Sequence, residues 1–259
     1  MSLRNASGGM VWWYNAPMQT SRWNWLSWLA LIVAVCAIAL LGLSGQGYRM
    51  GWFSLRTALQ QMLTWAAFGG IGAGVLGLLG FAISRGGARV AALLAIVVGL
   101  GTAYVPWQFQ RRAQEVPPIH DISTDTIAPP RYVETAVVRG EQQANSLDYS
   151  EEVAELQRTG YPDLAPAFLA ASPDDAYRRA LALVRARGWQ VVAADETGRR
   201  IEATDSTYWF GFKDDVAIRV SAIPDGSSRV DLRSVSRVGR SDIGTNAARI
   251  RAFLADLGR

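Results

Sequence analysis

The sequence predicts an α+β membrane protein, in which three transmembrane helices precede a two-layer domain with an antiparallel four-stranded sheet covered by helices. Two observations lead to this prediction. Three uncharged apolar runs fall within the first 107 residues, whereas the acidic residues lie beyond Gln114. Runs of alternating apolar and polar residues, typical of half-buried strands, follow in the second half. We therefore expect a membrane domain at 1–107, a proline-rich linker at 108–130 and a soluble domain at 131–259.

The apolar runs cover about residues 25–43, 63–83 and 90–107. Each approaches the ~20 apolar residues that cross a bilayer core, and none contains Asp, Glu, Lys, Arg or His. A cleaved signal peptide is the alternative for the first run, but the small-residue cleavage pattern that should follow is missing. The six residues SRGGAR, 84–89, connect the second and third runs, which therefore form an antiparallel hairpin.

Small residues recur every four positions along the hairpin. Such stripes let helices approach closely in lipid, although they could also simply face the lipid. We expect the stripes to pack against each other, and we expect the bilayer, and either a membrane-protein partner or a second copy of the chain, as partners. The stripes comprise Gly69, Ala73 and Gly77, then Ala66, Gly70 and Gly74, and on the third helix Ala91, Ala95, Gly99 and Ala103.

Arginines flank the spans equally on both sides, so the bare count does not orient the protein. The tight SRGGAR loop holds two arginines directly at helix ends, which favours its side as cytoplasmic. Three spans then place the C-terminal domain in the periplasm of a bacterium, anchored in the inner membrane. The two sets are Arg4, Arg22, Arg85 and Arg89 against Arg49, Arg56, Arg111 and Arg112.

The soluble half begins with helices that follow Ser150 and Ser172, both typical N-cap residues, and a last helix is expected to start near Ser241. Strand parity places Asp214 on the apolar face, where a carboxylate needs a partner. Across the last hairpin, we expect Arg219 and Asp231 opposite each other, and Asp215 and Arg233 diagonal, as an exposed ion-pair ladder. The expected strands are Trp189–Ala193, Arg200–Thr204, Thr207–Ala222 as one long strand, and Arg229–Arg237.

Composition excludes several classes of function. Cys36 is the only cysteine and His120 the only histidine, so intramolecular disulfides and metal sites built from several Cys or His ligands are excluded. We predict no metal and no cofactor. The net charge is +4, but the basic residues are scattered singly, which argues against nucleic-acid binding.

Long segments of the soluble half resemble the bacterial and plastid family called domain of unknown function 1499. The resemblance implies a domain that is fused to small membrane segments or exported to envelope and thylakoid compartments, with no established activity. It supports the architecture and leaves the function open. The segments are PPIHDISTD (117–125), YPDLAP (161–166), GRRIEATDSTYWFGFKDDVAIRV (198–220) and SSRVDLRSVSRVGRSDIGTNAARI (227–250).

One candidate ligand site lies at the start of the last helix, where unpaired N–H groups and nearby arginines attract anions. The alternative is internal: Arg237 or Arg240 neutralises Asp214 and leaves no room for an anion. The candidate residues are Asp214, Arg237, Arg240, Ser241, Asp242 and Asn246.

Two other patterns have competing interpretations. His120 beside Asp121 could serve as a general base, but a lone histidine in a proline-rich segment more often docks by hydrogen bonding. Tyr208, Phe210 and Phe212 form an aromatic stripe, which is core in most proteins and otherwise lines a lipid or pigment pocket.

These observations favour a non-enzymatic, membrane-anchored binding or assembly module and identify no catalytic residue. The alternatives are a hydrolase-like enzyme using Asp214 or Asp125, and a structural subunit of a larger membrane complex.

Overall fold

The computed structural model describes residues 23–140 and 144–259, which form two compact units. Among these residues, the first unit consists of those up to Leu41 and of Thr64–Tyr104, and the second of Gly42–Leu63 and those from Val105 onward. Arg4 and Arg22, two of the arginines that flank the predicted spans, lie outside the described residues.

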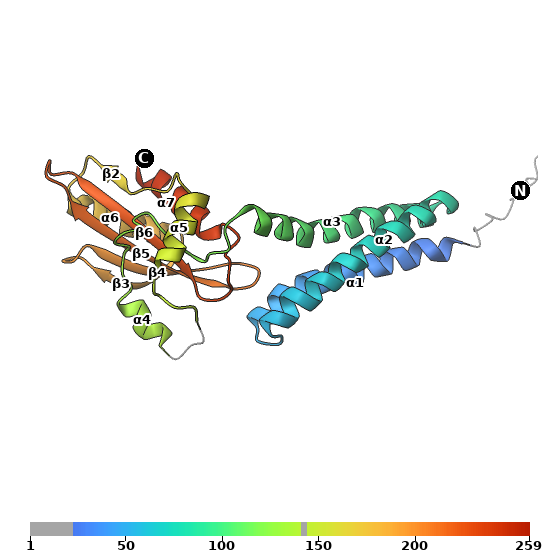
Figure 1. Cartoon of the computed structure of the whole chain (residues 1–259). Helices are drawn as coiled ribbons and strands as arrows, with labels where there is room; N and C mark the ends of the chain where they lie inside the picture. The colour runs from blue at the N-terminus through green and yellow to red at the C-terminus, as the bar shows by residue number, and fades with distance from the viewer. Residues whose placement is uncertain (1–22, 141–143) are drawn as a thin grey trace, which may run out of the picture. The chain divides into compact units, whose positions relative to one another are not determined.

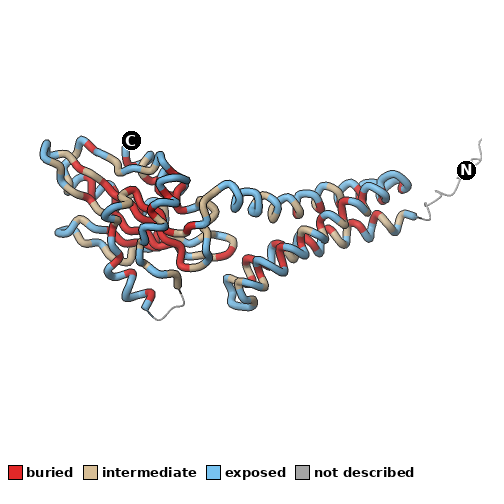
Figure 2. The backbone as a smooth tube through the Cα atoms, in the orientation of Figure 1, coloured by how far each residue is buried: buried red, intermediate tan, exposed pale blue. Residues whose placement is uncertain are grey.

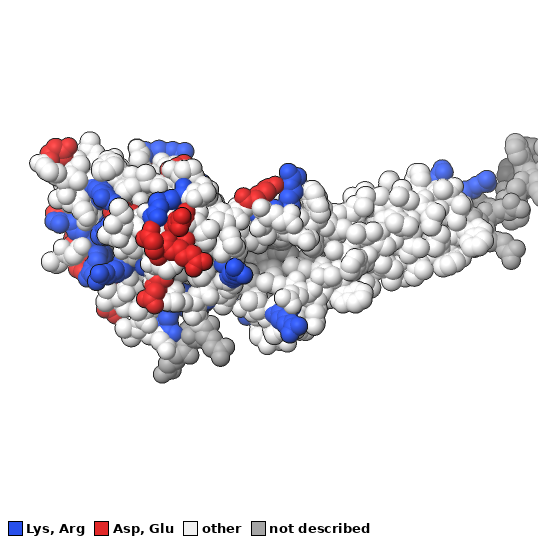
Figure 3. Space-filling view, in the orientation of Figure 1, with Lys and Arg blue, Asp and Glu red and all other residues white. Residues whose placement is uncertain are grey.

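The three apolar runs are helical, as predicted. They form α1 (Asn24–Arg49), α2 (Leu63–Ile83), which is preceded by the π-helix η1 (Thr57–Met62), and α3 (Gly87–Glu115) (Figure 1). Each is long and apolar enough to cross a membrane. In the first unit, these helices present almost no charged atoms on the face seen in Figure 3.

The small-residue stripes of α2 and α3 face each other at Gly70, Gly77 and Gly99, as predicted, whereas Gly69 faces Ala37 of α1. A Cβ on Gly99 would lie 2.5 Å from the carbonyl oxygen of Gly70, and one on Gly77 would lie 2.9 Å from that of Ala92. The two backbones therefore meet where only glycine fits. Against α1, the hydroxyls of Ser27 and Ser84 form a buried hydrogen bond of 2.8 Å.

In the second unit, one antiparallel sheet has the order β1-β6-β5-β4-β3, and β2 also pairs with β6 (Figure 1). The predicted four-strand meander is present as β3 to β6, while β1 and β2, each three residues long, were not predicted. The segment expected to be a linker thus contributes a strand. The strands are β1 (Asp121–Ser123), β2 (Ala167–Leu169), β3 (Gln190–Asp195), β4 (Arg200–Ser206), β5 (Lys213–Ala222) and β6 (Ser228–Ser236).

Helices α6 (Pro173–Ala186) and α7 (Thr245–Leu257) pack on one face of this sheet. That face is apolar: Val216, Ile218 and Leu232 are fully buried with Phe253 of α7 in the main core. Figure 2 shows the buried residues, in red, concentrated in the central strands. The apolar face is therefore the hydrophobic core of the unit.

A covering segment, residues 124–140 and 144–149, lies on the opposite face and contains α4 (Glu134–Arg139). The carboxylate of Glu202 on β4 accepts the N–H groups of Val133 at 2.8 Å and Thr135 at 2.7 Å, so it caps the start of α4. The hydroxyl of Tyr132 donates to the carbonyl oxygen of Asp215 on β5. These bonds attach the covering segment to the sheet.

Side-chain caps place the helices of the second unit. Ser150 and Ser172 cap α5 (Glu151–Gly160) and α6, as predicted. The prediction that α7 starts near Ser241 is wrong, because Gly244 has a φ of 79° and the helix begins only after it. The side chain of Gln157 on α5 accepts the N–H of Ser123 at 2.8 Å and donates to its carbonyl oxygen at 2.6 Å, so it pairs with β1 as a strand would.

The single long strand predicted over Thr207–Ala222 is also wrong. Residues 207–212 form a turn between β4 and β5, which we call the aromatic loop. The Thr207 hydroxyl accepts the N–H of Phe212 at 2.9 Å, and Gly211 has a φ of 66°. The alternation of aromatic residues in this segment resembles the sequence pattern of a strand, but the backbone forms a turn.

Candidate functional site

Asp214 lies on the apolar face in line with Val216, as strand parity predicts. Its carboxylate is only 3% exposed and receives Nη2 of Arg249 at 2.6 Å. Arg249 also binds Asp205 at 2.9 Å. The prediction that Arg237 or Arg240 neutralises Asp214 is therefore wrong, although the expected internal ion pair exists with a different arginine.

Arg237 instead lies on the opposite face of the sheet. Its Nε and Nη2 donate to the two carboxylate oxygens of Asp215 at 2.9 and 2.8 Å, and Nε of Arg139 lies 2.9 Å from the same carboxylate. Thr204 adds a hydroxyl donor at 2.7 Å. Because side chains alternate along a strand, Arg237 shares a face with Asp215 rather than with Asp214.

The other candidate residues have local roles. Asp242 accepts the N–H of Asn246 at 2.7 Å and therefore caps α7, a role predicted for Ser241. Burial raises the pKa of Asp242, and the N–H groups that it accepts oppose this rise. The buried side chain of Asn246 accepts from Ser234 and Arg249.

His120 behaves as a docking residue. Its carbonyl oxygen accepts Nδ2 of Asn246 at 2.9 Å, and its Nδ1 lies 3.4 Å from the carbonyl oxygen of the exposed Arg240. The neighbouring Asp121 pairs with Arg233 rather than with the imidazole. The His-Asp arrangement of a general base is therefore not formed.

The predicted ladder has the expected register, since Arg219 faces Asp231 and their closest atoms are 3.0 Å apart. However, its exposure was predicted wrongly: Asp231 and Asp215 are fully buried, and Arg233 is 3% exposed. Arg233 binds both oxygens of Asp121, at 3.0 and 2.6 Å. The covering segment makes this face an interior.

Asp125, the second acid considered for catalysis, lies in the covering segment. It contacts Arg219 at 2.9 Å and Arg229 at 2.8 Å and accepts the N–H groups of Ile127 and Ala128. Burial alone would raise its pKa, but these N–H groups and arginines outweigh burial and hold the pKa below the usual 3.8. This carboxylate is built to stay ionised and paired.

The aromatic loop meets the end of α1 within the second unit. Nη1 of Arg49 donates to the carbonyl oxygen of Tyr208 at 3.0 Å, and Nε1 of Trp209 donates to that of Gly42 at 3.3 Å. A Cβ on Gly211 would lie 3.0 Å from the Arg49 side chain, so glycine serves both the positive φ and this close approach.

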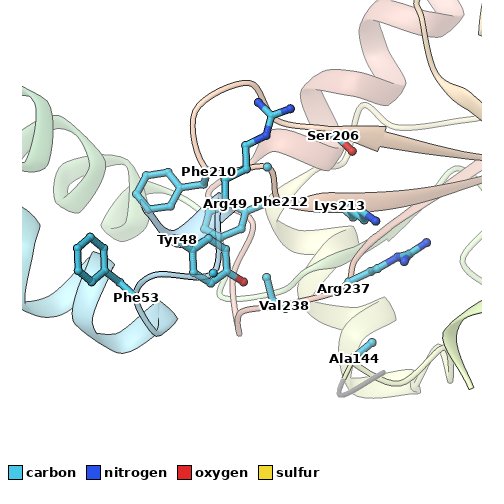
Figure 4. Close-up of a pocket in the computed structure, with 12 residues that line it drawn as sticks. Tyr48, Arg49, Phe53, Ala144, Ser206, Phe210, Phe212, Lys213, Arg237 and Val238 are labelled. Atoms are coloured by element: carbon cyan, nitrogen blue, oxygen red, sulfur yellow. The ribbon is translucent and has the colours of Figure 1, made fainter. Parts of the chain in front are cut away.

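Two cavities flank the aromatic loop, and both are lined by Phe210 and Phe212, whose rings stack with centroids 4.9 Å apart. The first, of about 560 Å³, carries three cationic side chains, from Arg49, Lys213 and Arg237 (Figure 4). We call it the cationic cavity.

The second, the apolar cavity, measures about 320 Å³ and is walled by leucines of the η1 region and by aromatic rings. Of the six predicted site residues, Asp214, Ser241 and Asp242 line it, whereas Arg237 lines the cationic cavity. The structure therefore divides four of the predicted residues between two cavities, whereas Arg240 and Asn246 line neither.

Sequence reasoning missed Arg49 and Lys213. Arg49 was counted only as a flanking charge, and Lys213, the only lysine, was assigned no role. Their separation along the chain hid the cavity that they share. Among the described residues, no group of three or more His, Cys, Asp or Glu side chains is placed to hold a metal ion.

Comparison with known proteins adds one finding. The family model described as "Protein of unknown function (DUF1499)" matches residues 121–257, just over half of the 259 residues. The chain belongs to this family. The match includes β1, which opens the sheet, and ends at the last residue of α7. No curated protein matched the sequence.

Proposed function

We propose that this protein is a non-enzymatic binding or assembly module anchored in the bacterial inner membrane, with its family domain on the periplasmic side. The observation that carries the proposal is the attachment of the aromatic loop to the end of α1. Exposed aromatic side chains gather where a helix leaves the headgroups: Trp52 is 63% and Tyr208 87% exposed. Both cavities open beside this junction.

The buried charges support binding rather than catalysis. Asp214, Asp215 and Asp125 are each held by at least one arginine at 2.9 Å or less. A general base needs a pKa near the working pH and a lone pair turned toward a substrate. The lowered pKa of Asp125 moves it away from the working pH, and the arginine bound to Asp214 occupies the carboxylate that would have to face a substrate.

Reporter fusions test the topology. Alkaline phosphatase fused after Arg259 is expected to be active, because three spans and a cytoplasmic SRGGAR loop carry the C-terminus across the membrane. A fluorescent protein that folds only in the cytosol should stay dark at the same position. The opposite pair of results would overturn the periplasmic assignment.

The enzymatic alternative makes a different prediction. Asp125→Asn and Asp214→Asn should impair the protein only as far as they lower its stability and abundance. If either variant loses its cellular function while its melting temperature and partner capture are unchanged, the hydrolase interpretation is favoured. Stoichiometric co-purification of another membrane protein in mild detergent would instead favour a structural subunit.

A further inference from the structure

We propose that the cationic cavity binds the phosphate of an anionic phospholipid from the membrane that holds α1, with Arg49 and Lys213 as its ligands. The inference deepens the proposed function by naming what the module binds. Among the described residues, the lining of this cavity contains two arginines and a lysine but no carboxylate.

The three cations are not equivalent. Arg237 is already engaged, because Asp215 accepts its Nε and Nη2 and shares the same carboxylate with Arg139. Within residues 23–140 and 144–259, Arg49 and Lys213 lie in no ion pair, and both are exposed. Two positive charges therefore line the cavity without an internal counterion in this part of the chain.

Arg49 is held in place for such a ligand. Its Nη1 donates to Tyr208, and its aliphatic stem passes Gly211, where a Cβ would come within 3.0 Å. A guanidinium that is already oriented loses less entropy when it binds, and its remaining N–H groups form a planar fork suited to phosphate oxygens. Lys213 supplies a mobile point charge from the start of β5.

The position of the cavity selects a lipid over other phosphate compounds. Arg49 is the last residue of α1, so its charge follows directly on a helix apolar enough to cross the membrane. Basic side chains at such helix ends lie at the depth of the headgroups. Tyr48, Phe53 and Phe212 add an aromatic wall suited to the glycerol and upper acyl region (Figure 4).

Lipid selectivity of the full-length protein tests the proposal. The protein is placed in nanodiscs of phosphatidylcholine with or without phosphatidylglycerol, and native mass spectrometry measures the ratio of the two lipids that stay bound. Wild type should retain phosphatidylglycerol preferentially and melt at a higher temperature when it is present. Arg49→Gln with Lys213→Gln should lower the ratio about tenfold or more, since each loses a charge-assisted contact.

The controls separate binding from folding and from bulk charge. Arg56→Gln removes one positive charge from the helical turn that leads into η1, outside the cavity lining, and should keep the wild-type ratio. The side chain of Lys213 makes no hydrogen bond within the described residues, so the Lys213→Gln variant should fold normally. It should still lose the preference for phosphatidylglycerol. Lys213→Arg should retain it.

Three results would overturn the proposal. These are equal retention of both lipids by wild type, full selectivity in the double variant, and an equal loss in Arg56→Gln. Glycerol 3-phosphate added to phosphatidylcholine nanodiscs distinguishes the source, because stabilisation by it at millimolar concentration would assign the cavity to a soluble phosphate instead. The reporter fusions and co-purification do not depend on Arg49 or Lys213, so a failure here leaves the proposed module intact.

Discussion

The two faces of the sheet in the second unit are both interiors, but they are built from opposite chemistry. Leu232 and Arg233 are neighbours on β6, and they are 0% and 3% exposed. Leu232 packs in the apolar core under α6 and α7, whereas Arg233 binds Asp121 and lies over the ring of Tyr132 under the covering segment. Hydropathy therefore identifies only one of the two interiors.

The two faces contribute differently to the stability of the fold. Burying a leucine side chain stabilises a fold by roughly 1.5–3 kcal/mol, without demanding one geometry. A buried ion pair contributes little net stability, because desolvation offsets the attraction, but losing one partner is costly. We infer that the apolar face supplies the stability of the unit, and that the ionic face fixes where the covering segment lies.

The largest effect is expected from breaking one buried pair. Arg233→Met keeps the volume but leaves Asp121, 2% exposed, without its arginine. The free energy of unfolding should fall by about 3–5 kcal/mol. Guanidinium denaturation of the full chain in detergent measures this, and Arg233→Met with Asp121→Leu should recover most of the loss. If the losses of the two single variants simply add in the double variant, Arg233 and Asp121 are not coupled and the prediction is wrong.

On the apolar side of the same strand, Leu232→Ala should cost about 2–5 kcal/mol, through lost burial and the cavity that remains. Leu232→Met is the matched control and should cost less than about 1.5 kcal/mol. The same denaturation assay compares both with Arg233→Met. Asp121→Leu should restore the stability lost in Arg233→Met. No single substitution on the facing strand should restore the stability lost in Leu232→Ala in this way. If one does, the contrast between the two faces is wrong.

A smaller effect is expected where the ionic face holds α4. Glu202→Gln removes the negative charge at the start of this helix and replaces one of the two accepting oxygens with an NH₂ group, which should cost about 1–2 kcal/mol. Hydrogen exchange should accelerate at the N–H of Thr135 and leave the α6 amides unchanged. The control is Glu196→Gln, which replaces an exposed glutamate in the β3–β4 turn. It should change neither the stability nor the exchange at Thr135. Unchanged exchange at Thr135 would remove Glu202 from the attachment.

The smallest effect is one of pH. The pKa of Asp125 is held below 3.8 in the folded state, so the folded protein keeps this carboxylate ionised to lower pH than the unfolded chain does. Its contribution to stability is complete above about pH 3.8 and is lost as the pH falls through the lowered pKa. Asp125→Asn should flatten the stability curve below pH 3.8. An identical slope in wild type and variant would contradict this.

Local signals in the sequence predicted much of this fold. Ser150 and Ser172 mark helix starts by their side-chain preferences, and alternation placed Asp214 on the correct face. Three-residue strands such as β1 have no periodicity to detect, and the aromatic loop imitates alternation.

The candidate site was less predictable. The partner of Asp214 is Arg249, one turn inside α7, and the partner of Arg233 is Asp121, more than a hundred positions earlier in the chain. Such pairs depend on tertiary packing, which alternation along one strand does not encode. The burial of the ionic face likewise depends on a covering segment that carries no hydrophobic pattern of its own.

The pairing of Gln157 with β1 has a consequence for solubility. A strand at the edge of a sheet offers unpaired N–H and C=O groups that can recruit strands from other molecules and start aggregation. On β1, the amide of Gln157 occupies both backbone groups of Ser123 from the side of α5. One glutamine side chain thus blocks strand addition at Ser123, which would matter most if copies of the protein are concentrated in one membrane.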